Sequence, residues 1–157
     1  MESDLLQLDA ELEARIPSGA LRTVSRKLGR QILRTLCVVR PDSRLDALAA
    51  MSPTGTHQPI AFGAVAAAIG LDPYSAALAA LYESVTGPAT AAIRLLGLDP
   101  FEVYAALARL SGHLDRLAAE AVARAAGPAD ELPSYSSPLL DIFAEQHARW
   151  EMRLFAS

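Results

Sequence analysis

Apolar residues recur at spacings of three and four along most of this chain, and this periodicity limits its possible folds more than any other feature. In residues 4–16 the periodic positions are Leu5, Leu8, Leu12 and Ile16. Asp72-Pro73 and Asp99-Pro100 mark helix starts, because Asp caps a helix and Pro suits its first turn. Only 6% of the residues are aromatic, and Ala and Leu dominate. We therefore predict an all-α fold without strands.

The length of the chain is sufficient for one domain with a sizeable core. It has 157 residues, of which 52% are hydrophobic. We expect a single-domain helical bundle over residues 1–157, with about seven to eight helices. Residues 127–137 contain Gly, Pro and Ser and should form a connector to a last helix that begins at Pro138.

The predicted helix over residues 18–38 carries a basic stripe, because Arg22, Arg26, Arg30 and Arg34 recur every four residues. A row of guanidinium groups can neutralise phosphates, so one candidate is a helical nucleic-acid-binding regulator. The net charge of −4 and the lack of aromatic residues between the arginines oppose this reading. We expect a solvated or partner-facing helix surface and no nucleic-acid partner, with the regulator kept as the alternative.

The sequence contains none of the common catalytic or phosphate-binding motifs. Its three histidines, His57, His113 and His147, are scattered singly, and no metal-ligand spacing surrounds His57. We expect no enzyme activity, no cofactor and no metal site, with His57 in a loop or capping position. Cys37 is interpreted as a small core residue.

The first residues are acidic and lack an apolar signal-peptide core, which predicts a cytoplasmic protein. The longest apolar run, residues 59–71, is too short to span a bilayer. We therefore expect no membrane association.

The last twenty residues describe an amphipathic helix that begins at Pro138 and runs almost to the end of the chain. Its periodic apolar residues are Leu139, Ile142, Phe143, Trp150 and Leu154. A terminus usually frays unless something holds it, so Phe155, near the end, suggests a tail that docks into a groove. The alternative is that Phe155 covers the chain's own core.

The C-terminal stretch reads Pro138-Leu139-Leu140-Asp141-Ile142, then His147, then Arg153-Leu154-Phe155-Ala156-Ser157. It resembles the C-terminus of the urease accessory protein UreF family, whose members commonly end in an RLFxS-type tail. Three further stretches resemble the same family, and one of them is His57 with the Ala-rich helix expected after it. The segment from Leu8 to Arg34 is similar to the middle of UreF, where R-x-x-S-x-x-x-G-R precedes an apolar turn. The segment Ala91-Ala92-Ile93-Arg94-Leu95 is similar to the family's A-x-x-A-x-[RK] segment.

This resemblance implies an all-helical, non-catalytic scaffold in nickel delivery to urease. Its partners would be the GTPase UreG, the protein called UreD or UreH, and the urease apoprotein, with a homodimer left open. By resemblance, Arg153, Leu154, Phe155 and Ser157 would form the tail that docks on UreD/UreH. Arg94 would be a GTPase-side contact.

The chain departs from the family pattern in two places. Family members usually start with two further helices carrying an LPxGxFxHSxGxE-like motif, which this sequence lacks, so the resemblance implies an N-terminally short member. The PLGQ-like turn of many members is replaced by Gly97-Leu98-Asp99-Pro100.

Overall fold

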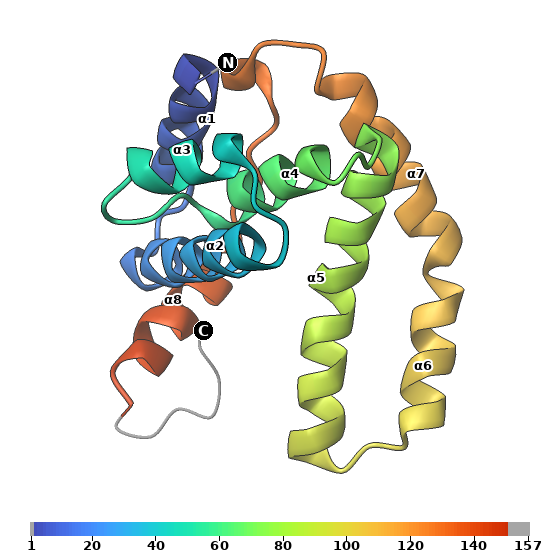
Figure 1. Cartoon of the computed structure of the whole chain (residues 1–157). Helices are drawn as coiled ribbons and strands as arrows, with labels where there is room; N and C mark the ends of the chain where they lie inside the picture. The colour runs from blue at the N-terminus through green and yellow to red at the C-terminus, as the bar shows by residue number, and fades with distance from the viewer. Residues whose placement is uncertain (1, 151–157) are drawn as a thin grey trace. The chain divides into compact units, whose positions relative to one another are not determined.

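The computed structural model describes residues 2–150 and is all-helical over this range, so the predicted all-α class is confirmed. The described residues form eight α-helices and one short 3-10 helix and contain no strand; the α-helices are labelled in Figure 1. They are α1 (Glu2–Arg15), α2 (Gly19–Val39), α3 (Ser43–Met51), α4 (Gln58–Ala68), α5 (Pro73–Leu96), α6 (Pro100–Arg109), α7 (Ser111–Arg124), η1 (Ala129–Glu131) and α8 (Pro138–Ala148). They form two compact units: α1 to α4, η1 and α8 in the first, and α5 to α7, within Gly70–Gly127, in the second.

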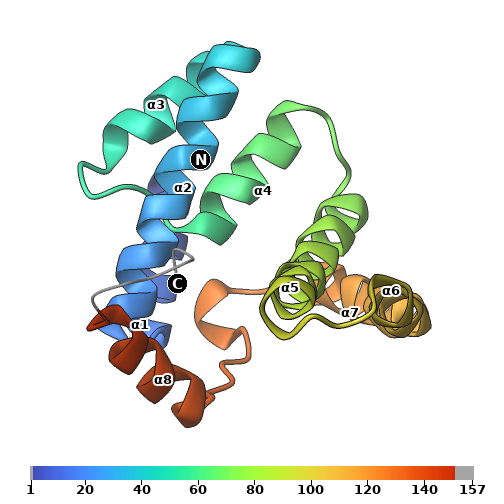
Figure 2. The same ribbon diagram turned by 90° about the horizontal axis from the view of Figure 1, so that it is seen from below.

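Helix α2 is the centre of the first unit and packs against α3, α4 and α8 (Figures 1 and 2). Ser18, whose residue type and position indicate a helix cap, is its N-cap and accepts a 3.1 Å hydrogen bond from the backbone N–H of Leu21. The buried core lies between α2, α3 and α4. Its members are Leu33, Leu45, Leu48, Ala61 and Val65, with Cys37 packed at its edge.

The loop that enters α4 crosses α2 at Gly29. A Cβ atom on Gly29 would lie 1.9 Å from the carbonyl oxygen of Thr56, which only glycine avoids. A glycine inside a helix predicts close packing against another helix. The close approach is present, but the partner is the backbone of a loop, so the expected helix partner is wrong. Gly55 in the same loop has a φ of +90°, which also favours glycine.

The second unit is a helical hairpin in which α6 and α7 run back alongside α5 (Figure 1). Its buried side chains are Leu114 and Ala118, both on α7. Helices α5 and α6 contain no buried residue. No helix in the described part of the chain is both long enough and apolar enough to cross a membrane.

Two helix boundaries in the second unit differ from what the sequence pattern indicates. The pair Gly87-Pro88 is typical of a helix end, yet α5 continues through Pro88 to Leu96. Proline removes one backbone donor, but Ser84, Gly87 and Pro88 are all exposed, so water can satisfy the carbonyl that loses its partner. Apolar residues recur at helical spacing from Val103 to Ala121, which predicts one helix after Asp99-Pro100. The structure instead divides it at Leu110, whose N–H donates a 3.0 Å hydrogen bond to the Leu107 carbonyl in a 3-10 turn.

Candidate functional site

A cluster of charged side chains joins α1, α2 and the loop before α4. Arg26 of α2 lies at its centre: its Nη1 is 2.9 Å from an Asp9 carboxylate oxygen, and its Nη2 is 2.8 Å from Oε2 of Glu13. The same guanidinium donates a 2.6 Å hydrogen bond to the carbonyl of Gly55. Burial alone would raise the pKa of the Glu13 carboxyl, but hydrogen bonds from Arg26 and His57 hold this pKa below its usual value.

His57 is the most deeply buried polar residue of this cluster, with 0% of its surface exposed. Its Nδ1 lies 3.0 Å from the Ser25 hydroxyl, and its Nε2 lies 2.8 Å from Oε2 of Glu13. Its backbone N–H donates to Asp9 at 2.8 Å. These bonds satisfy the polar atoms of a fully buried ring and join α1, α2 and the loop before α4.

His57 occupies the N-cap position of α4, as expected for a capping residue. Its side chain makes no capping hydrogen bond. Both ring nitrogens instead bind side chains from α1 and α2, which fixes the loop on the first unit.

The arginine stripe of α2 is largely committed to contacts within the first unit. Arg22 pairs with Glu13 at 2.9 Å, Arg26 belongs to the cluster, and Arg30 donates to the carbonyl of Thr54 at 2.9 Å. Arg34 has no such partner among residues 2–150. A continuous row of four guanidinium groups free to bind phosphates is therefore not present, which removes the main support for the nucleic-acid alternative.

Helix α8 is attached to the first unit by one carboxylate. Oε1 of Glu145 accepts a 2.7 Å hydrogen bond from the Ser18 hydroxyl and a 2.8 Å bond from the backbone N–H of Ala20, at the start of α2. These bonds, that of Ala20 first, lower the pKa of the Glu145 carboxyl. A negative charge is favourable at this helix end, where backbone N–H groups lack helical partners.

The outer face of α8 is apolar and exposed. Its large side chains, at 51–68% exposure, are Leu139, Leu140, Ile142 and Phe143. Only Ala144 of this helix is buried. Leu139, Ile142 and Phe143 belong to the apolar stripe that the sequence predicts, and the described chain leaves them exposed. The sequence predicts a helix that runs almost to the end of the chain, but α8 ends at Ala148. Beyond the helix, Trp150 meets the His147 ring edge-on, with ring centroids 5.0 Å apart.

Of the predicted site residues, the structure describes only Arg94. Arg153, Leu154, Phe155 and Ser157 lie outside the described residues, so the docking tail stays a prediction. Arg94 lies exposed in the last turn of α5, in the second unit. Its predicted role stays untested, as does a homodimer.

Within residues 2–150 no group of three or more His, Cys, Asp or Glu side chains is placed to hold a metal ion. Cys37 is half-buried beside the core, and this burial raises the pKa of its thiol. A raised pKa keeps the thiol protonated, and a thiol reacts far more slowly than a thiolate.

The sequence model of the UreF family matches residues 2–111, which covers most of the chain, including the charged cluster, α2 and Arg94. The chain belongs to the UreF family. It is 43% identical over 149 residues to the urease accessory protein UreF of Mycolicibacterium vanbaalenii, and 44% identical over the same length to that of Mycobacterium marinum. The UreF of Mycobacterium tuberculosis strain H37Rv is 40% identical over 149 residues.

These alignments cover 95% of this UreF-family chain but only 64–65% of each relative. The chain therefore spans less than two thirds of the length of these relatives. No solved structure matches it.

Sequence reasoning missed the carboxylate partners of α2, namely Asp9, Glu13 and Glu145. A signal for Glu145 was present, because the first turn of α2 contains no acidic residue to complete a capping box with Ser18. In the structure, one of its open N–H groups, that of Ala20, donates to a carboxylate from elsewhere in the chain. Nothing in the sequence indicated that this carboxylate would come from a helix 127 positions away.

Proposed function

We propose that this UreF-family chain is a non-catalytic accessory protein of urease maturation that acts in the cytoplasm. In this proposal it links the GTPase UreG to UreD/UreH while nickel is inserted into the urease apoprotein. The printed names of its relatives, urease accessory protein UreF, support the general role. The partner assignment extends the resemblance of the tail and of Arg94 to the family.

The observation that carries the proposal is the exposed apolar face of α8. This face is attached to α2 through Glu145, and it directly precedes the predicted tail. Uncovered patches of large apolar side chains are typical of protein interaction sites. We infer that UreD/UreH covers α8 and the tail together, with Leu154 and Phe155 as apolar anchors and Arg153 as a charge-assisted donor.

Arg94 is the proposed contact on the UreG side. It lies at the end of α5 and is followed in the sequence by the exposed Leu95 and Leu96. A partner that binds there would contact one positively charged side chain and two apolar ones. Arg94 and α8 belong to different units, so this proposal assigns the two partners to different units of the chain.

Co-purification tests the docking assignment. A tagged chain is expressed together with UreD/UreH and UreG, either at full length or ending at Glu151. We expect the shortened chain to lose UreD/UreH while its far-UV circular dichroism stays nearly unchanged. Equal capture of UreD/UreH by both chains would refute the tail assignment.

A matched pair of surface variants separates α8 from apolar surface in general. Leu139→Ser with Phe143→Ser removes two exposed side chains of α8, and Leu95→Ser with Leu96→Ser removes two exposed side chains of the second unit. The first pair should reduce the capture of UreD/UreH, and the second should leave it unchanged. The opposite result would move the docking site to the second unit.

A further inference from the structure

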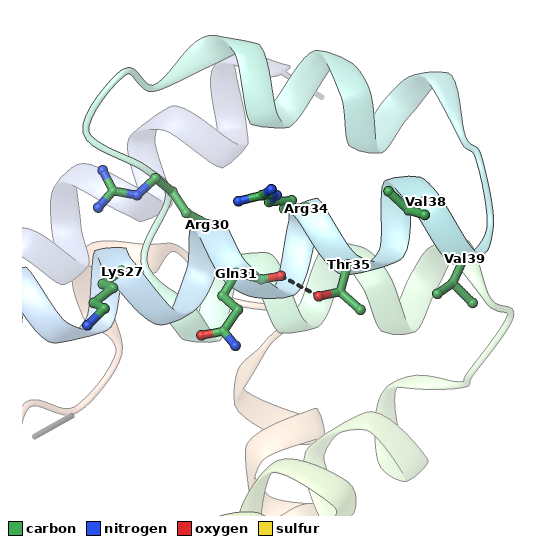
Figure 3. Close-up of a pocket in the computed structure, with 7 residues that line it drawn as sticks. All are labelled: Lys27, Arg30, Gln31, Arg34, Thr35, Val38 and Val39. Atoms are coloured by element: carbon green, nitrogen blue, oxygen red, sulfur yellow. Dashed lines mark hydrogen bonds between the residues drawn. The ribbon is translucent and has the colours of Figure 1, made fainter. Parts of the chain in front are cut away.

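A groove follows the outward face of α2 within the first unit (Figure 3). Its volume is about 690 Å³, and its lining residues are Lys27, Arg30, Gln31, Arg34, Thr35, Val38 and Val39. All seven of these side chains are exposed. The groove is separate from the docking face of α8, which meets α2 at its N-terminal end.

The groove is strongly basic, because three cations line it and no carboxylate does. Helix α2 contains no acidic residue from Gly19 to Val39. Asp9 and Glu13 already pair with other arginines of the helix, Arg22 and Arg26. Lys27 and Arg34 make no ion pair within residues 2–150, and Arg30 donates to one carbonyl only. This charge lacks an acidic counterpart in the described chain.

The C-terminal end of the groove is apolar. Val38 and Val39 are 79% and 73% exposed, which is unusual for valine. Lys27, Gln31, Arg34 and Val38 lie at spacings of four, three and four and therefore share one helix face. This face is about 16 Å long, or three helical turns.

We propose that this groove docks an acidic amphipathic helix of a partner protein. Carboxylates of the partner would pair with Lys27, Arg30 and Arg34, and an apolar side chain one turn further along would cover Val38 and Val39. Nucleic acid fits less well, because the groove has no aromatic lining residue for base stacking and a phosphate chain would leave the valines bare. A second copy of this chain fits less well too, since Asp9 and Glu13 of its acidic helix α1 are already paired.

Site-specific cross-linking tests this proposal with the full chain. The photoreactive residue p-benzoylphenylalanine replaces Val38 in one variant and the exposed Ala49 of α3 in a control variant. Both are expressed in cells that also make urease and its accessory proteins. We expect the Val38 variant alone to cross-link, and mass spectrometry should locate the linkage in a segment rich in Asp, Glu and large apolar residues. A linkage to a basic segment, to nucleic acid or to this chain itself, or no linkage, would overturn the proposal.

Charge reversal provides the second arm. Lys27→Glu, Arg30→Glu and Arg34→Glu together should reduce the cross-link about tenfold or more, as expected for the loss of three exposed ion pairs. The control reverses two exposed arginines of the second unit, Arg109→Glu with Arg124→Glu, and should leave the cross-link unchanged. Changing the carboxylates of the captured segment to lysine should then restore linkage to the reversed chain. If it does not, charge complementarity is not the basis of binding and the proposal fails.

Retention of UreD/UreH through α8 is the positive control in both arms. It shows that a failure at the groove is not a failure of folding or of the proposed function.

Discussion

The two compact units of this chain differ in how their apolar residues are used. The first unit buries a cluster between α2, α3 and α4, and ties α1 and the α4 loop to it through Arg26 and His57. The second buries only Leu114 and Ala118 among its described residues, while Phe101 and Leu96 are 85% and 71% exposed. Apolar side chains left in water contribute little to folding and remain available for partners.

This difference indicates that stability is concentrated in the first unit. The second unit retains an apolar hollow of about 540 Å³ between α5 and its neighbours, bordered by Tyr82 and Leu107. Segments with few buried contacts open at lower free energies than cores do. The same kind of substitution should therefore have different consequences in the two units.

The largest contrast is expected for glycine. Gly29→Ala places a Cβ atom against the Thr56 carbonyl and should lower the free energy of unfolding by about 3 kcal/mol or more. In Gly112→Ala of the second unit, the new Cβ atom has no neighbour within 4 Å, so this change should raise the free energy of unfolding by up to about 1 kcal/mol. Urea denaturation measures both. Similar midpoints for the two variants would show that the loop moves away from α2 at little cost.

Histidine gives the next contrast. His57→Ala removes a fully buried ring with two side-chain hydrogen bonds and should cost about 2–4 kcal/mol. His113→Ala removes an exposed ring of α7 and should change stability by less than about 0.5 kcal/mol. Thermal unfolding followed by circular dichroism compares them. Equal effects would mean that the buried cluster does not hold α1 and the α4 loop in place.

Ion pairs should differ in the same direction. The side chain of Arg26 is only 18% exposed, and Arg26→Met leaves Asp9 and Glu13 without their shared partner, at a cost of about 1–2 kcal/mol. Arg116→Met breaks a pair with Glu120 whose side chains are 54% and 43% exposed, and should cost at most about 0.5 kcal/mol. The unfolding midpoints of both variants in urea measure these costs. A larger loss of stability for Arg116→Met than for Arg26→Met would show that the ion pairs of the first unit are not the stronger ones.

The smallest effect concerns α8 and depends on pH. The pKa of Glu145 is lowered in the folded chain, so its contribution is fully present above the ordinary value of 4.5 and is lost as the pH falls through the lower folded value. Glu145→Gln should abolish this pH dependence and speed amide exchange in α8. Glu83→Gln, an exposed change in α5, is the matched control. If amide exchange in α8 changes neither with pH nor in Glu145→Gln, the bonds of Glu145 do not hold α8 against α2.

The sequence predicted the features that depend on local chemistry. Ser18, Asp72 and Asp99 are the N-caps that their positions indicated, and Gly29 marks a close approach. Pro88 was misleading, because the cost of a proline inside a helix depends on whether water reaches the carbonyl it leaves free.

The candidate site was less predictable, because it depends on pairs far apart in the chain. The bonds from Glu13 to His57 and from Ser18 to Glu145 join residues 44 and 127 positions apart. An arginine stripe has the same sequence pattern whether it faces water, a partner or two carboxylates of a neighbouring helix. Only the folded arrangement separates the committed Arg22 and Arg26 from the available Arg34 and Lys27.

Hydrogen exchange of the full chain, measured alone and with UreD/UreH bound, tests most directly whether this partner docks on α8. We predict that residues 138–150 gain protection on binding, because the partner covers the exposed face of α8, while residues 70–127 exchange as before. Protection confined to residues 70–127, with 138–150 unchanged, would place the docking site on the second unit and contradict the account.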